Sequence, residues 1–546
     1  MRRLALVLAL ALGCTTPDLA PAPGAGPPTR AGAEQEARAA LLLSGPEWYR
    51  HAVFYEVNVR SFADANGDGV GDLAGLTGKL DYLKGLGVDA LWLMPIMPTA
   101  FKDSGYDVSD YRAINPEYGD LAAFDALIAA AHQRKMRVLI DLVLNHTASN
   151  HAWFTESRSS RTNPKADWYV WSDTPGRADI GCGTAGPTFG DSAWTFEPKR
   201  GQYYFHRFYP EQPDLDYRNP EVVAETLDTA RWWLARGADG FRCDVIGMLY
   251  ERADGCDMVP ETVEYIRRLR AVLDEFPDRT MVSESSLANA APYLGTGRDM
   301  FPMTFDFAYG YLWNLAFAAQ NRRIVWNALE GALATYPPGA QDASLVGSHD
   351  VARAYVRANG LEWRHRRAAE ISMFMKATPF VYYGDELGLR PGAQVIVDTR
   401  DSARTPMPWT RAEPNHGFTT GKPWIAFGDE AAATSVEAED ADASSMLTFY
   451  RRLLAFRRGH AVWGAGDMKL VDVDDGSVLA FVRRDAQEAY LVVESFSEDA
   501  TRASGPSADV GAIGERVWGD GAARVAGDRL EVSLPAAGSA VFRLAR

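Results

Sequence analysis

The stretch that decides the fold is RVLIDLVLNH, residues 137–146. Its first eight residues form a short, largely apolar run rich in β-branched side chains, which is typical of a strand. The run contains an acid, Asp141, and two polar residues, Asn145 and His146, follow at its carboxyl end. A helix-like segment with regularly spaced apolar residues, 121–135, precedes it. One strand and one helix of this kind predict a repeating α/β unit.

The same alternation extends along the chain in both directions from this stretch. Seven further runs are strand-like: 52–59, 89–96, 240–246, 279–285, 304–309, 343–348 and 380–386. Helical segments such as 73–87 and 222–237 lie between them and end in Gly, a common helix stop. Eight such units predict an α/β fold of the (β/α)8 TIM-barrel type. The alternative is an open doubly wound sheet, which is expected to carry a Gly-rich phosphate turn after its first strand; NGDGVGD, residues 66–72, is the only candidate.

Changes in composition divide the chain into parts. Residues 1–14 are predicted to be a signal peptide with a lipobox-like end, and 15–46 a tether rich in Pro, Ala and Gly. The barrel is assigned to 47–146 and 220–455, interrupted by an inserted loop domain, domain B, at 147–219 that follows the third strand. Residues 456–546 alternate like short strands with turns between them and are predicted to form a C-terminal antiparallel β domain.

The amino terminus predicts export. A positive MRR is followed by the apolar LALVLALALG and then by Cys14, an arrangement that resembles a bacterial lipobox. We expect a periplasmic or cell-surface lipoprotein, the alternative being ordinary signal cleavage near the same place. In an oxidising compartment Cys182 and Cys256 could pair, whereas Cys243 lies in an apolar run and is expected to be a buried thiol.

The composition restricts the partners. With 47% hydrophobic and 23% charged residues, the chain is globular rather than disordered. A formal net charge of -16 disfavours nucleic acid and anionic membrane surfaces as partners, so that membrane attachment is expected only through the lipid anchor. This charge suits a neutral substrate.

The loop DANGDGVGD, residues 64–72, has the spacing of a cation site. Oxygen donors fall at its first, third, fifth and ninth positions, and a backbone carbonyl falls at the seventh. The acids would repel a phosphate, whereas this pattern matches most of an EF-hand-like calcium loop, with Gly75 where the last Glu would stand. A solvated acidic turn is the alternative. We expect a structural Ca²⁺ held by Asp64, Asn66, Asp68, Val70 and Asp72.

Polar side chains follow several predicted strands. Any one of them alone would be explained as a helix cap or an ion pair, but chemistry in a barrel lies at the carboxyl ends of the strands, where all of them would meet. They are Asp141, Asn145, His146, Arg242, Asp244, Glu284, His349 and Asp350.

This set of residues favours glycosidic bond cleavage. The sequence has no H-E-x-x-H and no G-x-S-x-G, the motifs of zinc and serine hydrolases. Paired carboxylates fit a mechanism in which one attacks the sugar and another donates a proton. Arg242, two residues before Asp244 on the same strand face, is expected to keep that acid ionised.

From about Trp48 onward the chain resembles the α-amylase family of retaining glycoside hydrolases. Its motifs GYDVSDY, DLVLNH, QPDLDY, GFRCDVI, SE, HD and RDSARTPMPW occur in that family's order. The resemblance implies that Asp244 is the nucleophile, Glu284 the general acid/base, and Asp350 the carboxylate that helps to distort the sugar. It further implies a substrate-binding set of Tyr106, Asp107, His146, Arg242, His349 and Arg404.

The resemblance leaves the branch of the family open. QPDLDY and Val245, the residue after the nucleophile, resemble the oligo-1,6-glucosidase group, whereas Ser348 and Asp216 depart from common patterns. We expect a monomeric hydrolase of α-glucosidic bonds in oligosaccharides or α-glucans, of α-glucosidase, oligo-1,6-glucosidase or α-amylase type. The alternatives are a transglycosylase or isomerase of trehalose synthase type, and a non-catalytic glucan-binding protein.

Overall fold

The computed structural model describes residues 30–545 except 182–187, 189, 286–289 and 397–398. The signal segment and Cys182 lie outside the described residues, so export, lipid attachment and the pairing of Cys182 with Cys256 stay predictions. Cys243 is a free, buried thiol, as predicted. Within the described part of the chain, no helix is long and apolar enough to span a membrane.

Eight parallel strands close into a barrel, which confirms the predicted (β/α)8 fold. An open sheet is excluded because β1 pairs with both β2 and β11. Each strand overlaps one of the eight predicted apolar runs, and every strand residue except Arg137 is buried. The strands are β1 Phe54–Val57, β2 Ala90–Leu93, β3 Arg137–Val143, β7 Gly240–Asp244, β8 Thr280–Ser283, β9 Met303–Phe305, β10 Gln341–Leu345 and β11 Ala377–Tyr382.

Helices surround this barrel, and several of them begin at side-chain caps. Asp72, Asp120 and Asn219 each accept a backbone N–H in the first turn of the helix that they precede. Gly237, in the left-handed conformation, ends α7 at the predicted stop. The barrel helices are α2 Val59–Phe62, α3 Leu73–Gly78, α4 Leu80–Leu86, α5 Leu121–Gln133, α7 Pro220–Arg236, α8 Pro260–Asp274, α9 Phe307–Ala318, α10 Arg323–Thr335, α11 Ala354–Arg357, α12 Glu362–Phe374, α13 Val436–Asp440 and α14 Met446–Arg457.

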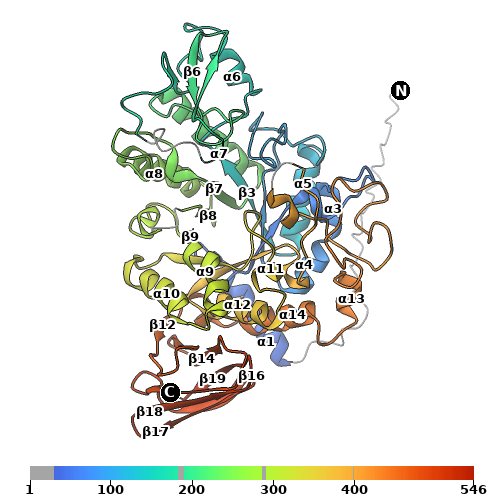
Figure 1. Ribbon diagram of the computed structural model, residues 1–546, viewed down its shortest axis with the longest axis vertical. Coiled ribbons are helices and arrows are strands. Elements are labelled where there is room, and N and C mark those ends of the chain that lie inside the picture. The colour runs from blue at the N-terminus through green and yellow to red at the C-terminus, as the bar shows by residue number, and fades with distance from the viewer. Residues whose placement is uncertain (1–29, 182–187, 189, 286–289, 397–398, 546) are drawn as a thin grey trace, which may run out of the picture.

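The residues between β3 and α7 fold beside the barrel mouth (Figure 1). They comprise α6 Ala152–Ser157 and a small antiparallel sheet of β4 Trp171–Ser172, β5 Trp194–Glu197 and β6 Gln202–Phe205. Most aromatic side chains of this segment pack together; Phe154, for example, stacks on Trp171 and meets Tyr204 edge-on. The aromatic richness of the sequence here therefore serves mainly a local core.

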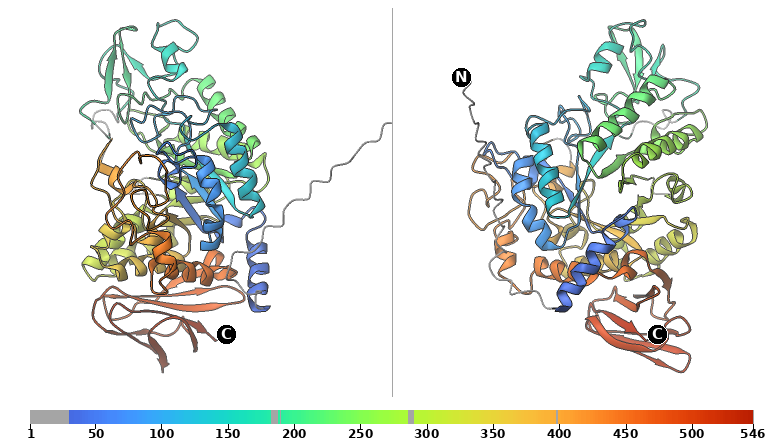
Figure 2. Two further views of the ribbon diagram at one scale, coloured as in Figure 1. Left: turned by 90° about the vertical axis from the view of Figure 1, so that its right-hand side faces the viewer. Right: turned by 180° about the vertical axis from the view of Figure 1, so that it is seen from behind.

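The chain ends in antiparallel sheets at the opposite end of the molecule from the inserted segment (Figures 1 and 2). A short helix, α15 Ala461–Ala465, leads into them. One sheet has the order β12-β13-β14-β19-β16 and the other β15-β18-β17. Their bounds are β12 Asp467–Leu470, β13 Val478–Arg484, β14 Ala489–Ser495, β15 Thr501–Pro506, β16 Ile513–Gly519, β17 Ala522–Ala526, β18 Arg529–Leu534 and β19 Ser539–Leu544.

Part of the predicted tether is a helix. Residues 30–42 form α1, Arg30–Leu42, which docks on the end of α14: Gln35 Nε2 donates to the carbonyls of Ala455 and Arg458, and Glu36 pairs with Arg458 at 2.8 Å. The stretch is rich in Ala, Glu and Arg, which are strong helix formers. The neighbouring Pro-rich sequence concealed this preference.

A buried arginine fastens the C-terminal sheets to the barrel. Arg483 on β13 has no exposed surface and donates to five backbone carbonyls at 2.5–3.0 Å. Two of these carbonyls, those of Phe374 and Met375, lie at the end of α12, and the other three lie in and just after α15. The Met375 and Val462 carbonyls also accept from the N–H groups of Ala377 and Gly466. For the other carbonyls the guanidinium is the donor that carbonyls at helix ends lack within the helix.

We predict that Arg483→Met lowers the free energy of unfolding by about 3 kcal/mol or more, since it leaves several carbonyls buried without donors. Urea denaturation followed by tryptophan fluorescence measures this change. Arg484→Met is the matched control: this neighbour on the same strand is exposed and is expected to change stability by less than about 0.5 kcal/mol. Equal effects of the two substitutions would contradict the fastening role.

Candidate active site

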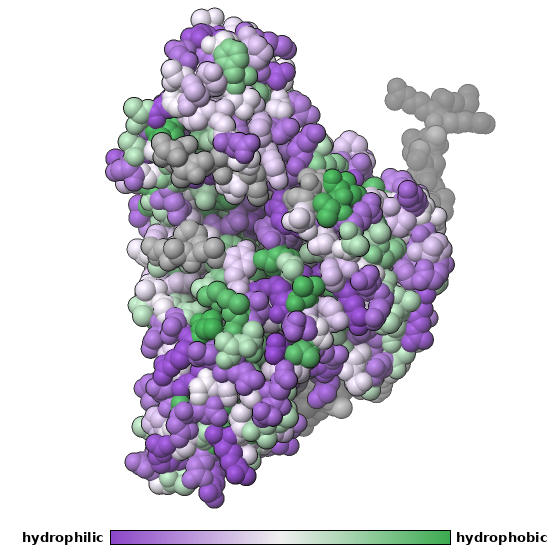
Figure 3. All heavy atoms as spheres, viewed as in Figure 1, coloured by the Kyte–Doolittle hydropathy of each residue, from purple (hydrophilic) through white to green (hydrophobic). Residues whose placement is uncertain are grey.

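Polar side chains from separate strands meet at the carboxyl end of the barrel. Arg242 and Asp244 close β7, and Glu284 follows β8 directly. Asp141 lies within β3, and Asp350 lies in the segment after β10. The face of the molecule that presents this mouth is hollowed at its middle, where hydrophilic residues line the recess (Figure 3).

The Arg242 guanidinium is the centre of the cluster. Its Nη1 lies 2.6 Å from Asp244 Oδ1 and 2.9 Å from Asp141 Oδ1, and its Nη2 lies 2.8 Å from Glu284 Oε2. Arg242 and Asp141 are at most 2% exposed, whereas the side chains of Asp244 and Glu284 are 9% and 20% exposed. The two predicted reacting carboxylates therefore share one arginine and remain open to the recess.

One guanidinium faces three carboxylates here. Burial raises the pKa of Asp244; Arg242 opposes this, and the neighbouring Glu284 and Asp141 raise the pKa further. Burial also raises the pKa of Asp141 against the effect of Arg242. The sequence predicted the pairing of Arg242 with Asp244. It did not predict that Asp141 and Glu284 would bind the same arginine. A single positive charge therefore faces three carboxyl groups, and the three groups titrate together rather than independently.

The residue after Asp244 holds Glu284 through its backbone. Val245 has φ 35° and ψ 34°, a left-handed conformation that β-branched residues rarely adopt. Its N–H donates to Glu284 Oε2 at 3.0 Å. Both contacts of Glu284 are made by Oε2, and its Oε1 has no hydrogen-bond partner among the described residues.

Asp350 is surrounded by basic groups. Arg400 Nη1 donates to its Oδ1 at 2.9 Å, and His349 Nε2 lies 3.2 Å from its Oδ2. Burial alone would raise the pKa of Asp350, but His349, Arg400 and Arg404 together hold it below the usual range for an aspartate. Asp350 is therefore the permanently ionised carboxylate of the mouth.

Tyr106 joins His349 to the arginine cluster. Its Oη lies 3.0 Å from Asp141 Oδ2 and 2.7 Å from His349 Nε2, and the tyrosine and histidine rings stack at 5.4 Å. The other ring nitrogen of His349, Nδ1, lies 2.6 Å from Oε1 of the buried Glu56 on β1. A continuous polar chain thus runs from β1 to Arg242.

His146 is held from the inserted segment. Gln212 of QPDLDY, which is fully buried, lies 3.2 Å from His146 Nε2 and donates to Asp103 Oδ2 at 3.1 Å. Asp103 Oδ1 in turn accepts from Arg400 Nη2 at 2.6 Å. Burial lowers the pKa of His146 to about 4, so this ring is neutral and acts as a hydrogen-bonding group.

Two predicted substrate-binding residues lie behind this surface. Asp107 is fully buried, and its carboxylate accepts from Thr99 Oγ1 and from three backbone N–H groups of its own loop. Arg404, 1% exposed, donates to the His349 carbonyl and to Ser104 Oγ, and its guanidinium stays 3.7 Å from Asp350. In the structure these residues shape the wall, and Arg400 rather than Arg404 makes the close contact with Asp350.

Sequence reasoning named no role for four residues of the mouth. Gln212 and Arg400 lie inside the quoted motifs QPDLDY and RDSARTPMPW, so the motifs themselves were the available signal. Asp103 precedes GYDVSDY, and Glu56 lies in the first predicted strand. No local feature of the sequence marks Asp103 or Glu56. Only long-range packing links Asp103 to His146, through Gln212, and brings Glu56 to His349.

The predicted calcium loop is an ordered turn. Asp64 accepts from the N–H groups of Gly67 and Gly69 at 2.6 and 2.8 Å, and Asp72 caps α3 through the N–H of Gly75. The loop rests on residues 419–424, where Trp424 N donates to the Gly69 carbonyl at 2.9 Å. No group of three His, Cys, Asp or Glu side chains in the described ranges is arranged to hold a metal ion. A cation here would need the Asn66 amide and the Val70 carbonyl as well.

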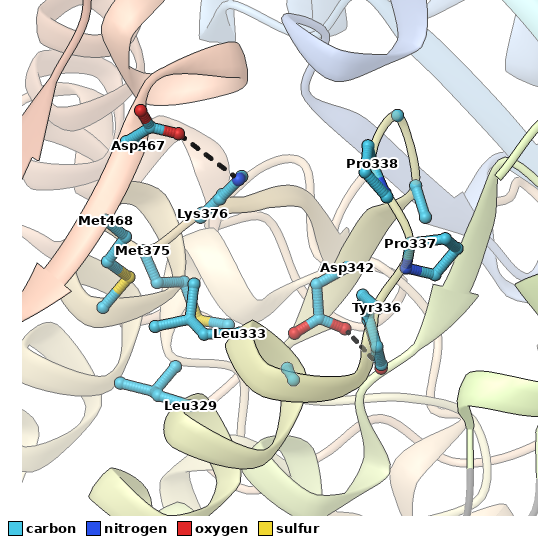
Figure 4. Close-up of a pocket in the computed structure, with 13 residues that line it drawn as sticks. Leu329, Leu333, Tyr336, Pro337, Pro338, Asp342, Met375, Lys376, Asp467 and Met468 are labelled. Atoms are coloured by element: carbon cyan, nitrogen blue, oxygen red, sulfur yellow. Dashed lines mark hydrogen bonds and ion pairs between the residues drawn. The ribbon is translucent and has the colours of Figure 1, made fainter. Parts of the chain in front are cut away.

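A separate cavity of about 300 Å³ lies beside the C-terminal sheets (Figure 4). Its walls include Leu333 and Met375, and Tyr336 faces Asp342 at 3.4 Å. Asp342 stands near the amino end of β10, opposite the mouth. The cavity is therefore no part of the carboxylate cluster.

Comparisons with known proteins agree with this geometry. The family model described as "Alpha amylase, catalytic domain" matches residues 56–466. A protein named "Probable alpha-glucosidase" from Rhizobium meliloti (strain 1021) is 36% identical over 93% of this chain and 99% of its own. "Trehalose synthase/amylase TreS" from Mycolicibacterium smegmatis is 38% identical over 83% of each chain, and "Oligo-1,6-glucosidase" from Halalkalibacterium halodurans is 32% identical over 82% of this chain and 90% of its own.

A solved structure shows the same architecture. The crystal structure of the alpha-glucosyl transfer enzyme XgtA superposes with a TM-score of 0.80 at 33% identity, covering 91% of this chain and all of the other. Its printed activity is glucosyl transfer, so the matched proteins include ones named as glucosidases, a synthase and a transfer enzyme. With a family model that matches most of its length, and relatives of more than 30% identity, this chain belongs to the alpha-amylase family.

Proposed function

We propose that the protein cleaves α-glucosidic bonds in short oligosaccharides, with retention, through a covalent glycosyl-enzyme on Asp244. The observation that carries this proposal is the shared arginine, because Arg242 binds Asp244 and Glu284 with the two nitrogens of one guanidinium. That arrangement supports the short separation, roughly 5 Å, that a retaining pair requires. The alpha-amylase family relationship supports the same reaction class.

The contacts assign a role to each oxygen. Arg242 holds Asp244 Oδ1, which leaves Oδ2 to attack the anomeric carbon. The bond from that carbon to the leaving oxygen breaks as Glu284 Oε1 donates its proton to the leaving group. Glu284 then takes a proton from water, or from a second sugar, as that molecule attacks the same carbon and releases Asp244. Asp350, kept ionised by its neighbours, is the acceptor for sugar hydroxyls.

A row of linked side chains at one side of the mouth would block a long glucan and so favours short substrates. Arg400 links Asp350 to Asp103, and Gln212 links Asp103 to His146. These residues come from loops after β2, β3, β10 and β11 and from the inserted segment, so they join the rim where a long glucan would have to pass. Val245 and QPDLDY, through their resemblance to the oligo-1,6-glucosidase group, favour isomaltose-type linkages among such substrates.

Glucosyl transfer is the second candidate function. It is favoured by the similarity to proteins named trehalose synthase and to an alpha-glucosyl transfer enzyme. The chemistry up to the glycosyl-enzyme is the same, and the outcome depends on whether water or a retained sugar attacks next. We propose hydrolysis as the main reaction and transfer as its competitor.

Product chromatography after incubation with isomaltose, maltose, trehalose and starch tests the function, with Asp244→Asn as the control. We expect glucose from isomaltose, released first as the α-anomer by NMR, and no turnover by the control. Interconversion of maltose and trehalose without net hydrolysis would assign the protein to the transferring branch. Products from starch alone would contradict the barrier argument.

We predict that Glu284→Gln lowers kcat on 4-nitrophenyl α-glucoside by about 100-fold or more, the contribution of a general acid. A substrate with a 2,4-dinitrophenolate leaving group needs no protonation, so its glycosylation step should be nearly unaffected. Added azide, which needs no general base, should restore turnover and yield α-glucosyl azide. The absence of this rescue would remove Glu284 from the acid/base role.

We also propose that residues 64–72 bind a structural Ca²⁺ through Asp64, Asn66, Asp68, Asp72 and the Val70 carbonyl. The ligand spacing and the packing of the loop on residues 419–424 support this site. A cation there would neutralise acids that now accept from backbone N–H groups and, at Asp64, from the Thr419 hydroxyl. It would also hold the first barrel loop against a distant part of the chain.

Dialysis against EDTA should lower Tm by several degrees, because an ion present at about 100 times its Kd stabilises the folded state by about 2.7 kcal/mol. Ca²⁺ should restore the wild type but not Asp68→Asn. Asp120→Asn, at the cap of α5, is the control that should still respond to Ca²⁺. An EDTA-independent Tm would show that the hydrogen bonds of the loop suffice.

Export and lipid attachment at Cys14 remain part of the proposal and rest on the amino-terminal sequence. A monomer in the periplasm or at the cell surface would meet oligosaccharides before uptake, in keeping with a short neutral substrate.

A further inference from the structure

A buried glutamate lies behind the predicted substrate-binding histidine. Glu56 on β1 is 2% exposed, and its Oε1 lies 2.6 Å from His349 Nδ1 and 3.3 Å from the His349 backbone N. Among the described residues, His349 is the only basic side chain within ion-pair distance of Glu56. Because burying an unpaired carboxylate is costly, this contact is strong evidence for a charged partner.

The other nitrogen of the ring faces acceptors. His349 Nε2 lies 3.2 Å from Asp350 Oδ2, and an ionised carboxylate can only accept. It also lies 2.7 Å from Tyr106 Oη, whose single hydrogen is directed to Asp141 Oδ2 at 3.0 Å. With that hydrogen committed, the tyrosine oxygen accepts as well. Both ring nitrogens therefore have the surroundings of N–H donors.

Charged and titratable groups from every neighbouring element contribute to the environment of this ring. Negative charges stand on two sides, in Glu56 and Asp350, and Asp141 lies behind Tyr106. The nearby positive groups in the described part of the chain do not contact the His349 ring directly. Arg404 donates to the His349 backbone carbonyl, and Arg242 is bound to the carboxylates of β3 and β7. The Trp92 ring meets the imidazole edge-on at 5.7 Å.

We propose that Glu56 is a positioning residue of the active site, whose carboxylate keeps both nitrogens of His349 protonated and directs the Nε2–H into the mouth beside Asp350. The inference rests on the proposed function, since it gives the histidine a sugar to bind. A fixed N–H donor next to a carboxylate acceptor suits one sugar hydroxyl that accepts from the histidine and donates to Asp350. Without the charge of Glu56, the ring would lose its second proton at a lower pH than in the wild type. Its Nε2 would then present a lone pair, not an N–H, to that hydroxyl.

Glu56→Gln tests this because it keeps the shape and an acceptor while removing the charge. We expect kcat/KM on an activated aryl α-glucoside to fall at least tenfold at pH 8 and to return to within a few-fold of wild type near pH 5, where the ring is protonated in both proteins. The alkaline limb of the profile should shift to lower pH by at least about one unit, the usual effect of losing an opposite charge at this distance. A loss that is the same at every pH would mean that Glu56 serves only the packing.

Glu386→Gln is the matched control. Glu386 is also buried, one strand away near β11, and accepts from Tyr55 and Tyr82 at 2.7 Å without touching the carboxylate cluster. Its substitution is expected to lower stability but to leave the pH profile in place. An equal shift in this variant would overturn the assignment to Glu56.

The protonation of the ring can be measured without turnover. In ¹⁵N-histidine-labelled protein, the signal of His349, identified by its loss in His349→Asn, should show two N–H nitrogens at pH 7.5 in the wild type and a neutral ring in Glu56→Gln. A neutral ring in the wild type would refute the proposal even if the protein cleaves α-glucosides. If no α-glucoside is cleaved or transferred, the proposed function fails, and the signal still reports whether Glu56 controls His349.

Discussion

The active site depends on one buried arginine. The Arg242 guanidinium keeps its charge at any ordinary pH and presents a rigid fork, so it can hold several carboxylates at fixed angles to one another. It binds Asp141 of β3, Asp244 of its own strand and Glu284 after β8. This arrangement follows from the strand order, because β7 lies between β3 and β8 and brings their carboxyl ends to the same place. The fold thus determines which acids meet, and the arginine determines how they lie.

The rim of the mouth is built differently, from loops that only tertiary contacts join. Asp103 receives Arg400 on one oxygen and Gln212 on the other, so that the loops after β2 and β11 and the inserted segment meet at a single carboxylate. A site assembled from several loops can vary at the rim while the strands behind it stay fixed. This separation is consistent with solved structures named as a transfer enzyme and as a trehalulose synthase, which share the fold of this chain.

The far end of the molecule serves stability rather than chemistry. Arg483 binds carbonyls from α12 and α15, and α1 rests on the end of α14. In both places, a side chain satisfies backbone carbonyls at helix ends. These contacts join the C-terminal sheets and the first helix to the barrel without approaching the carboxylates.

The sequence by itself determined the barrel and predicted which carboxylates stand at its mouth. Apolar runs alternating with helical segments are local patterns, and eight of them allow few architectures. Asp244, Glu284 and Asp350 could then be expected at the barrel mouth, because each lies in or just after the carboxyl end of a run. The roles of Glu56, Asp103 and Arg400 could not be predicted, since each depends on a partner more than one hundred residues away. Only tertiary structure brings such partners within hydrogen-bonding distance. For the same reason the sequence predicted that Asp107 and Arg404 bind substrate, whereas only the tertiary structure shows that Asp107 accepts from Thr99 in its own loop and that Arg404 donates to the His349 carbonyl.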